Sequence, residues 1–190
     1  MEEVAMRTAS HSLRLPLLLA LMLTGGVIGC TFKEVTPEVL KAPTQKYPVV
    51  VVGDITAEDK LWDYLVPHFR RGLVKELTEQ KAFDAVLETA PAPVPDSAVV
   101  VTGKITEVDK GNLALRWLVG LGAGKAQVSG AFEISDSGGQ TLAKLKASES
   151  YLGGAGIGGA GFLDMEDLMR RFGETMADKI TKWSRGEKLE

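Results

Sequence analysis

Cys30 is the residue whose side chain offers the most distinctive chemistry in this sequence. It is the only cysteine among 190 residues, so it can form neither an intramolecular disulfide nor a thiolate metal cluster. It directly follows Val27-Ile28-Gly29, at the end of an apolar stretch that begins at Leu15. A thiol at such a position can carry a diacylglycerol group through a thioether, and Gly29 lets a peptidase approach the bond before the cysteine.

Residues 1–29 have the composition of a secretory leader. Two arginines precede the apolar stretch, and the uncharged run from Leu15 to Cys30 is shorter than the roughly 20 residues that a spanning helix needs. Val27-Ile28-Gly29-Cys30 resembles the bacterial lipobox, which predicts a lipoprotein signal peptide over 1–29 and acyl chains such as palmitate on Cys30. The next residue is Thr31 rather than aspartate, which by resemblance to Gram-negative sorting signals favours the periplasmic face of the outer membrane.

The rest of the sequence carries few groups arranged for catalysis. The 22 Lys and Arg residues against 25 Asp and Glu residues leave a net charge of −3, which argues against nucleic-acid binding. His68 is the only histidine after the leader, so a zinc site with several histidines is excluded. Gly120 to Lys125 resembles a P-loop only superficially, because three residues instead of four separate Gly120 from Gly124 and Ala126 follows the lysine. We expect a protein that is not an enzyme and holds neither a cofactor nor a metal, with His68 at the surface or boundary.

The pattern of apolar residues predicts an α+β fold, a mixed and largely antiparallel sheet packed against two helices in the order β-α-β-β-β-β-α. Strands are expected at 49–52, 83–87, 98–106, 125–135 and 141–148, with a hairpin turn at 136–139, and helices at 61–81 and 164–183. In the first helix an apolar stripe recurs every four residues, at Leu61, Leu65, Phe69, Leu73 and Leu77. Pro67 lies inside that helix, so the helix either begins near Pro67 or kinks there.

The domain boundaries follow from composition. Residues 30–47 hold prolines among Thr, Lys and Glu, which we interpret as the lipidated cysteine and a tether. An extended tether of this length could hold the domain up to about 50 Å from the lipid. The α+β lipoprotein domain is expected over 48–185, followed by a polar tail over 186–190.

Two glycine-rich segments, 111–124 and 151–162, are unusually apolar for connections between elements. Arg116 is the only charged residue in the first segment, and the second has none. Three interpretations remain open: packing onto the domain, contact with a protein partner or a second copy, and insertion into the bilayer near the anchor. The candidate contact residues, with Trp117 as the anchor of the contact, are Arg116, Trp117, Leu118, Gly120, Gly122 and Gly124.

The stretch from Gly103 to Ala126, GKITEVDKGNLALRWLVGLGAGKA, resembles the signature region of a bacterial lipoprotein family catalogued as a domain of unknown function, DUF4410. The similarity extends over about residues 47–183. It implies an envelope lipoprotein and supplies no catalytic residues. The β-α-β start also looks like the N-terminal domain of TolB, at the level of the fold alone.

We expect a non-enzymatic adaptor or assembly accessory of the cell envelope, anchored in the membrane by its lipid and binding an envelope protein or another copy of itself. One alternative is a small-ligand or lipid-binding module with a pocket between the sheet and the last helix. A second alternative, a carboxylate-based hydrolase of envelope polymers, would require a cleft with two facing acids of raised pKa.

Overall fold

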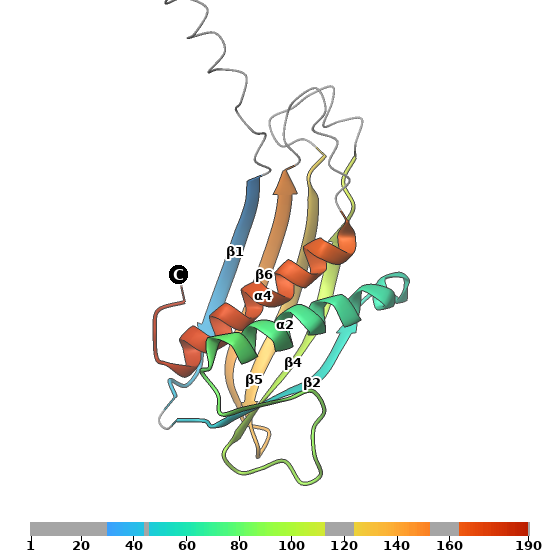
Figure 1. Ribbon diagram of the computed structural model, residues 1–190. Coiled ribbons are helices and arrows are strands. Elements are labelled where there is room, and N and C mark those ends of the chain that lie inside the picture. Colours follow the sequence, from blue (N-terminus) through green and yellow to red (C-terminus); the bar gives the residue numbers. More distant parts are fainter. Residues whose placement is uncertain (1–29, 44–45, 113–123, 153–163, 190) are drawn as a thin grey trace, which may run out of the picture.

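A six-stranded sheet with two helices on one of its faces forms the domain (Figure 1). The computed structural model describes residues 30–43, 46–112, 124–152 and 164–189. The strands are β1 (Cys30–Val39), β2 (Val49–Ala57), β3 (Ala85–Leu87), β4 (Ala98–Asp109), β5 (Ala126–Asp136) and β6 (Thr141–Leu152), and the helices are the 3-10 helix η1 (Lys60–Leu65), α2 (Val66–Gln80) and α4 (Met165–Ser184). The predicted α+β class and the predicted order from β2 to α4 are confirmed, and β1 is an additional strand in front.

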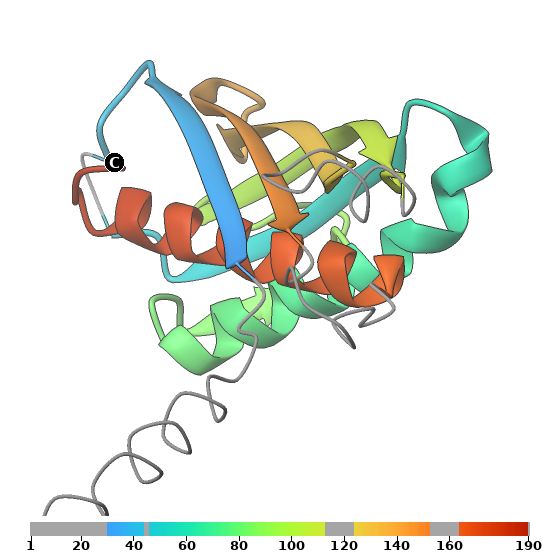
Figure 2. The ribbon, with the colours of Figure 1, turned by 90° about the horizontal axis from the view of Figure 1, so that it is seen from above.

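The sheet is mixed, with strand order β1-β6-β5-β4-β2-β3. The valine-rich strand β2 lies between β3 and β4 and is parallel to both, whereas the other neighbouring strands are antiparallel. A parallel pair needs a crossover, and α2 lies in the connection from β2 to β3. Figure 2 shows both long helices on the same side of the sheet, so no helix of the described residues lies on the other face.

The predicted tether over 30–47 is wrong for its first ten residues, which form the edge strand β1. This strand pairs with β6 from Cys30 opposite Leu152 to Val39 opposite Ala143. Proline and charged residues are tolerated at an edge because one side of the strand has no neighbour to receive hydrogen bonds. The composition that suggested a linker is therefore also that of a protected sheet edge, and the domain begins at Cys30 rather than at residue 48.

The helix that the sequence predicts over 61–81 divides at Pro67. The 3-10 helix η1 begins after Asp59, whose side chain accepts a hydrogen bond from the Leu61 backbone N–H at 2.9 Å, and α2 begins at Val66 with the proline in its first turn. Proline is acceptable there because the first N–H groups of a helix have no partner within the helix. The four later members of the apolar stripe are buried, including Leu65 at the end of η1, but Leu61 in the first turn of η1 is 65% exposed.

Three phenylalanine rings lie in the centre of the core. The rings of Phe69 on α2 and Phe132 on β5 are stacked, with centroids 5.1 Å apart. Phe172 on α4 meets them edge-on at 5.5 and 5.8 Å. All three side chains are at most 1% exposed, so their contacts pack both helices against the sheet.

Gly72 and Gly173 let the two helices cross at close range. A Cβ added at Gly72 would lie 2.0 Å from the carbonyl oxygen of Arg170, and one added at Gly173 would lie 2.2 Å from that of Phe69. These distances leave no room for a side chain at either position. The glycines therefore allow the backbones of α2 and α4 to touch.

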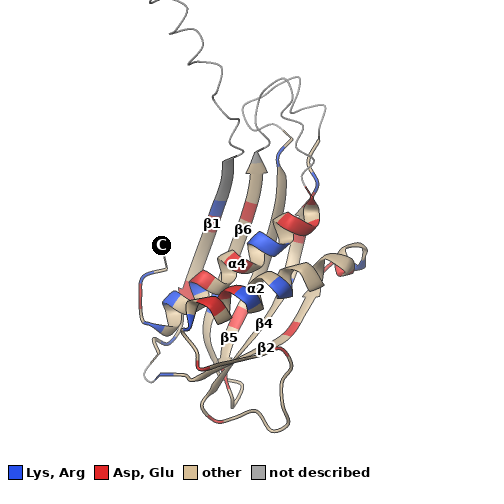
Figure 3. Cartoon of the chain, in the orientation of Figure 1, with Lys and Arg blue, Asp and Glu red and all other residues tan. Residues whose placement is uncertain are grey.

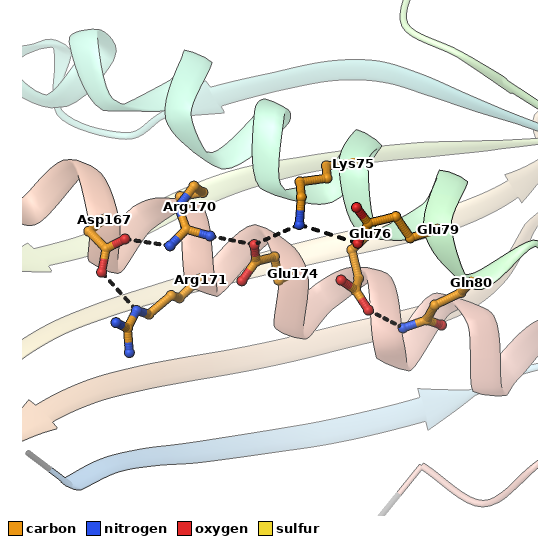
Figure 4. Close-up of polar contacts among 8 residues, drawn as sticks. All are labelled: Lys75, Glu76, Glu79, Gln80, Asp167, Arg170, Arg171 and Glu174. Atoms are coloured by element: carbon orange, nitrogen blue, oxygen red, sulfur yellow. Dashed lines mark hydrogen bonds and ion pairs between the residues drawn. The ribbon is translucent and has the colours of Figure 1, made fainter. Parts of the chain in front are cut away.

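An ion network covers the outer side of this crossing (Figures 3 and 4). Arg170 bonds to both Asp167 and Glu174 on its own helix, and Lys75 on α2 lies 3.9 Å from Glu174. Lys75 also pairs with Glu79 at 3.2 Å. The network joins the helices through partly exposed charges, which individually add little to stability.

Candidate interaction surfaces

Four strand ends lie in one row at the end of the sheet where Cys30 begins β1. Cys30 is opposite Leu152 at the end of β6, Ala126 at the start of β5 is opposite Tyr151, and Asp109 at the end of β4 is opposite Gln127. Figure 1 shows these ends together. The chain therefore passes from residue 29 into the sheet at the same end at which both glycine-rich segments join the strands.

Most of the predicted contact and lipobox residues fall outside the described part of the chain. This holds for Val27, Ile28, Gly29, Arg116, Trp117, Leu118, Gly120 and Gly122. Gly124 is described: it has a φ of 69°, which favours glycine, and its carbonyl oxygen accepts a hydrogen bond from the Asn112 N–H at 3.2 Å. Gly124 therefore closes the base of the β4–β5 connection, and the predicted contact with a partner stays a prediction.

An aromatic and apolar patch on η1 lies beside the end of β4. We call Leu61, Trp62 and Tyr64 the η1 patch: Leu61 and Tyr64 are 65% and 50% exposed, and Trp62 is half-buried. The Trp62 and Tyr64 rings are 6.4 Å apart, and the Lys110 ammonium lies 5.0 Å from the centre of the Trp62 ring. The apolar repeat predicted Leu61 as part of the buried stripe, so the sequence did not predict this patch. The 3-10 turn places Leu61 outside the α-helical repeat.

A shallow groove of about 470 Å³ lies on the sheet face that carries no helix, and we call it the open-face groove. It crosses four strands, and its lining residues are Glu34, Thr36, Thr106, Gln127, Ser129, Gly130, Ala131, Lys146, Ala147 and Ser148. Within it the Gln127 amide donates to Ser129 Oγ at 3.4 Å, and that hydroxyl donates to Glu107 at 3.2 Å. The alternation of β5 predicted its polar face, but four aligned strands were needed to form the groove.

Glu149 is a buried carboxylate on the opposite, helix-covered face of β6. Thr175 on α4 donates a hydrogen bond to its Oε2 at 2.7 Å, whereas Oε1 has no hydrogen-bond partner in the described residues. Burial raises the pKa of Glu149, and the Thr175 hydrogen bond and the charges of Lys33 and Arg171 oppose this rise. Lys33 stands directly opposite Glu149 in the β1–β6 register, so β1 supplies part of the compensating charge.

The pH dependence of stability should therefore contain a contribution from Glu149. The folded chain holds this proton more tightly than the unfolded chain, whose value is near 4.5, so the contribution is lost as pH rises through the raised pKa. We expect Glu149→Gln to gain stability relative to the parent as the pH increases above about 4.5, measured by urea unfolding at a series of pH values. Thr175→Val, which removes the opposing hydrogen bond, should steepen the parent's pH dependence. A stability difference between Glu149→Gln and the parent that stays constant with pH would contradict the assignment.

The described residues offer little for the two alternative functions. Phe172, Met176 and Ile180 fill the space between the sheet and α4 with no measurable exposure, which argues against a ligand pocket there. A hydrolase of this kind would need acids of raised pKa in a cleft. Among the described residues, burial raises the pKa of Glu149, but Glu149 lies beneath α4 and not in the open-face groove. The described residues therefore do not place two facing acids of raised pKa in a cleft.

Metal sites and membrane spans are likewise not found in residues 30–43, 46–112, 124–152 and 164–189. No three His, Cys, Asp or Glu side chains of these ranges come together as possible metal ligands. No helix formed by the same ranges has both the length and the apolar character needed to cross a membrane. His68 Nε2 lies 3.5 Å from Glu166 Oε2 in a half-buried position, which is the predicted boundary location.

Comparison with known proteins identifies the family. The sequence profile of the family described as "Domain of unknown function (DUF4410)" matches residues 54–155, from β2 to just beyond β6. The chain belongs to the DUF4410 family. This confirms the resemblance that the Gly103–Ala126 stretch indicated. No curated protein sequence matches this DUF4410 chain.

Solved structures share the fold of this DUF4410 domain at low sequence identity. The PelC dodecamer from Paraburkholderia phytofirmans superimposes with a TM-score of 0.54 and 11% identity, over 83% of this chain and 99% of that chain. A point variant of that dodecamer gives 0.47 and 14% over the same shares, and a minor lipoprotein from Acinetobacter baumannii gives 0.38 and 15% over 73% and 94%. The first likeness shows a common fold, and the two lower scores support no inference.

Proposed function

We propose that this DUF4410 chain is a lipoprotein held at the periplasmic face of the outer membrane by acylated Cys30, and that its domain is a non-enzymatic adaptor or assembly accessory of the cell envelope. The observation that carries the adaptor role is the open-face groove. It hollows a polar face of the six-stranded sheet across four of its strands, and no helix of the described residues covers that face.

The chemistry of the groove suits a polar partner surface. Threonine and serine hydroxyls, the Gln127 amide, Glu34 and Lys146 offer both donors and acceptors of hydrogen bonds. Interfaces of adaptors are commonly as polar as the rest of a protein surface, so such a lining is compatible with protein binding. The common fold with PelC, which forms a dodecamer, makes a second copy of the chain one partner to look for.

In-cell photo-crosslinking tests the adaptor role. A photoreactive residue is placed at Ser129 in the groove, at Trp117, and at Glu79 on the outer side of α2 as the matched control. We expect a discrete crosslinked protein from Ser129 and none from Glu79, and a band of twice the chain's mass would identify self-association. Equal labelling from Ser129 and Glu79, or none from Ser129 in a folded protein, would contradict an adaptor that binds through the groove.

The anchor is tested separately. We expect Cys30→Ser to abolish the acyl mass and to release the chain from the membrane fraction, because several acyl chains make an anchor close to permanent. Thr31→Asp should move the acylated chain from the outer to the inner membrane in a density gradient, whereas Thr31→Ser should not. An unacylated parent chain, or a parent chain in the inner membrane, would contradict the proposed location.

A further inference from the structure

The acylated residue and the folded domain have no linker between them. Cys30 is itself the first residue of β1 and pairs with Leu152, so the strand continues from the anchor directly into the sheet. A lipid on Cys30, as the proposed function requires, would therefore bring the row of strand ends to the membrane. This placement differs from that of a domain on a tether about 50 Å long.

Basic residues lie along this row of strand ends. Lys110 follows the end of β4 directly and Lys125 precedes the start of β5, and both are exposed. Lys33, the fourth residue of β1, lies further from the row, opposite Glu149. Neighbouring strands are about 4.8 Å apart, so β1 and β4 are separated by only about 14 Å across the row. The Asp109 carboxylate at the same end accepts a hydrogen bond from the Gly111 N–H at 2.7 Å. The row thus presents ammonium groups of the kind that anionic lipid headgroups attract.

The η1 patch adds residues that favour the boundary between water and acyl chains. Tryptophan and tyrosine concentrate there because each combines an apolar ring with a polar N–H or O–H group. Trp62 lies under the Lys110 ammonium, so the patch and the basic row meet at this lysine. The sequences that join the sheet at this end, 113–123 and 153–163, contain Arg116 as their only charged residue.

We propose that Leu61, Trp62 and Tyr64, together with Lys110 and Lys125, form a surface that contacts phospholipid and holds the domain directly against the membrane. Contact through this surface gives the domain one orientation on the membrane. In this orientation β1 begins at the bilayer with Cys30 and runs away from it. The open-face groove is then presented to the side, within reach of neighbours on the same membrane. The inference rests on acylation of Cys30, but the contact itself is made by residues remote from Cys30 in sequence.

Tryptophan fluorescence tests this contact in the full, acylated chain. Trp117→Phe leaves Trp62 as the reporter and Trp183 as an internal reference, since Trp183 is 1% exposed and stacked on Tyr47. The protein is reconstituted in vesicles of phosphatidylethanolamine and phosphatidylglycerol with or without brominated acyl chains, which quench an indole only at short range. We expect brominated lipid to reduce the emission of this variant and to leave the double variant Trp62→Phe, Trp117→Phe unchanged.

Charge variants locate the surface. Lys110→Glu combined with Lys125→Glu should reduce the quenching of Trp62, whereas Lys46→Glu should not, because Lys46 precedes β2 at the opposite end of the sheet. If the Lys110→Glu, Lys125→Glu double variant and the Lys46→Glu variant change the quenching of Trp62 equally, the proposal is overturned. It is also overturned if brominated lipid does not quench Trp62 in an acylated chain. A protein crosslink from position 64 with no lipid quenching would assign the surface to a protein partner and also overturn it.

The two proposals can fail independently. The mass of the purified chain reports whether Cys30 carries the acyl group, and Trp62 quenching reports the lipid contact. If the acyl mass is absent, the proposed anchor fails, and the same vesicles mixed with the unacylated full chain still decide the surface. Quenching of Trp62 in that mixture supports the contact, and its absence overturns it.

Discussion

Replacing Gly173 with alanine is expected to lower the free energy of unfolding by about 3 kcal/mol, even though alanine is the better helix former. The added Cβ would lie 2.2 Å from the Phe69 carbonyl oxygen and 2.8 Å from the Leu73 backbone nitrogen. Both are backbone atoms of α2, so no side chain can rotate away to make room. The helices must separate, which loosens the Phe69–Phe172 contact at 5.5 Å. Urea unfolding followed by circular dichroism measures the loss.

Two further variants make this prediction specific to the helix crossing. Gly72→Ala should lose a similar amount, because its Cβ would lie 2.0 Å from the Arg170 carbonyl oxygen. Gly138→Ala in the β5–β6 turn is the matched control: its Cβ would approach only the Asp136 side chain, at 3.3 Å, so a change within about 0.5 kcal/mol is expected. A Gly173→Ala chain as stable as Gly138→Ala would show that the helices do not touch as described.

Truncation of Phe132 should have an effect of comparable or greater size, a loss of about 4 kcal/mol for Phe132→Ala. The ring is 1% exposed and contacts Phe69 and Phe172, so its removal leaves a cavity where both helices meet the sheet. The same urea experiment measures the loss. A loss below about 1 kcal/mol would contradict the central place of this ring in the core.

Gly103 provides a sharper test of the same ring. A Cβ at Gly103 would lie 2.2 Å from Cδ1 of Phe132, so Gly103→Ala should destabilise the parent by about 2 kcal/mol. In the Phe132→Ala background the added methyl group occupies vacated space, and we expect a favourable coupling of about 1–3 kcal/mol in the double-mutant cycle. Gly138→Ala, which has no contact with the ring, should be additive with Phe132→Ala. Additivity of Gly103→Ala as well would show that the ring does not fill the space above this glycine.

The elements that sequence predicted well are those specified by local signals. Asp164 caps α4 by accepting a hydrogen bond from the Glu166 N–H at 2.9 Å, as its position before an amphipathic run indicated. The β5–β6 turn follows from Asp136 and from Gly139, which has a φ of 83°. Each of these features depends on residues within a few positions of one another, so composition and spacing suffice to predict it.

Edge strand β1 and the outward position of Leu61 were not predictable in the same way. The pairing of β1 depends on β6, more than a hundred residues later, so its own proline and charges suggested a linker. Leu61 satisfies the helical apolar repeat, but Pro67 places the start of α2 at Val66 and leaves Leu61 in a 3-10 turn. In both cases a tertiary contact or a change of helix type overrode a regular local pattern.

Residue patterns and a short characteristic stretch were enough to predict the family, the α+β class, the two amphipathic helices and the polar face of β5. The tertiary structure was needed to show that four strand ends lie together where Cys30 begins, that the η1 patch reaches Lys110 after the end of β4, that Glu149 lies buried opposite Lys33, and that four polar strand faces form one groove. The physical reason is the strand order β1-β6-β5-β4-β2-β3. That order results from pairing between distant segments and from the packing of both helices on one face, and no local window of residues contains this information.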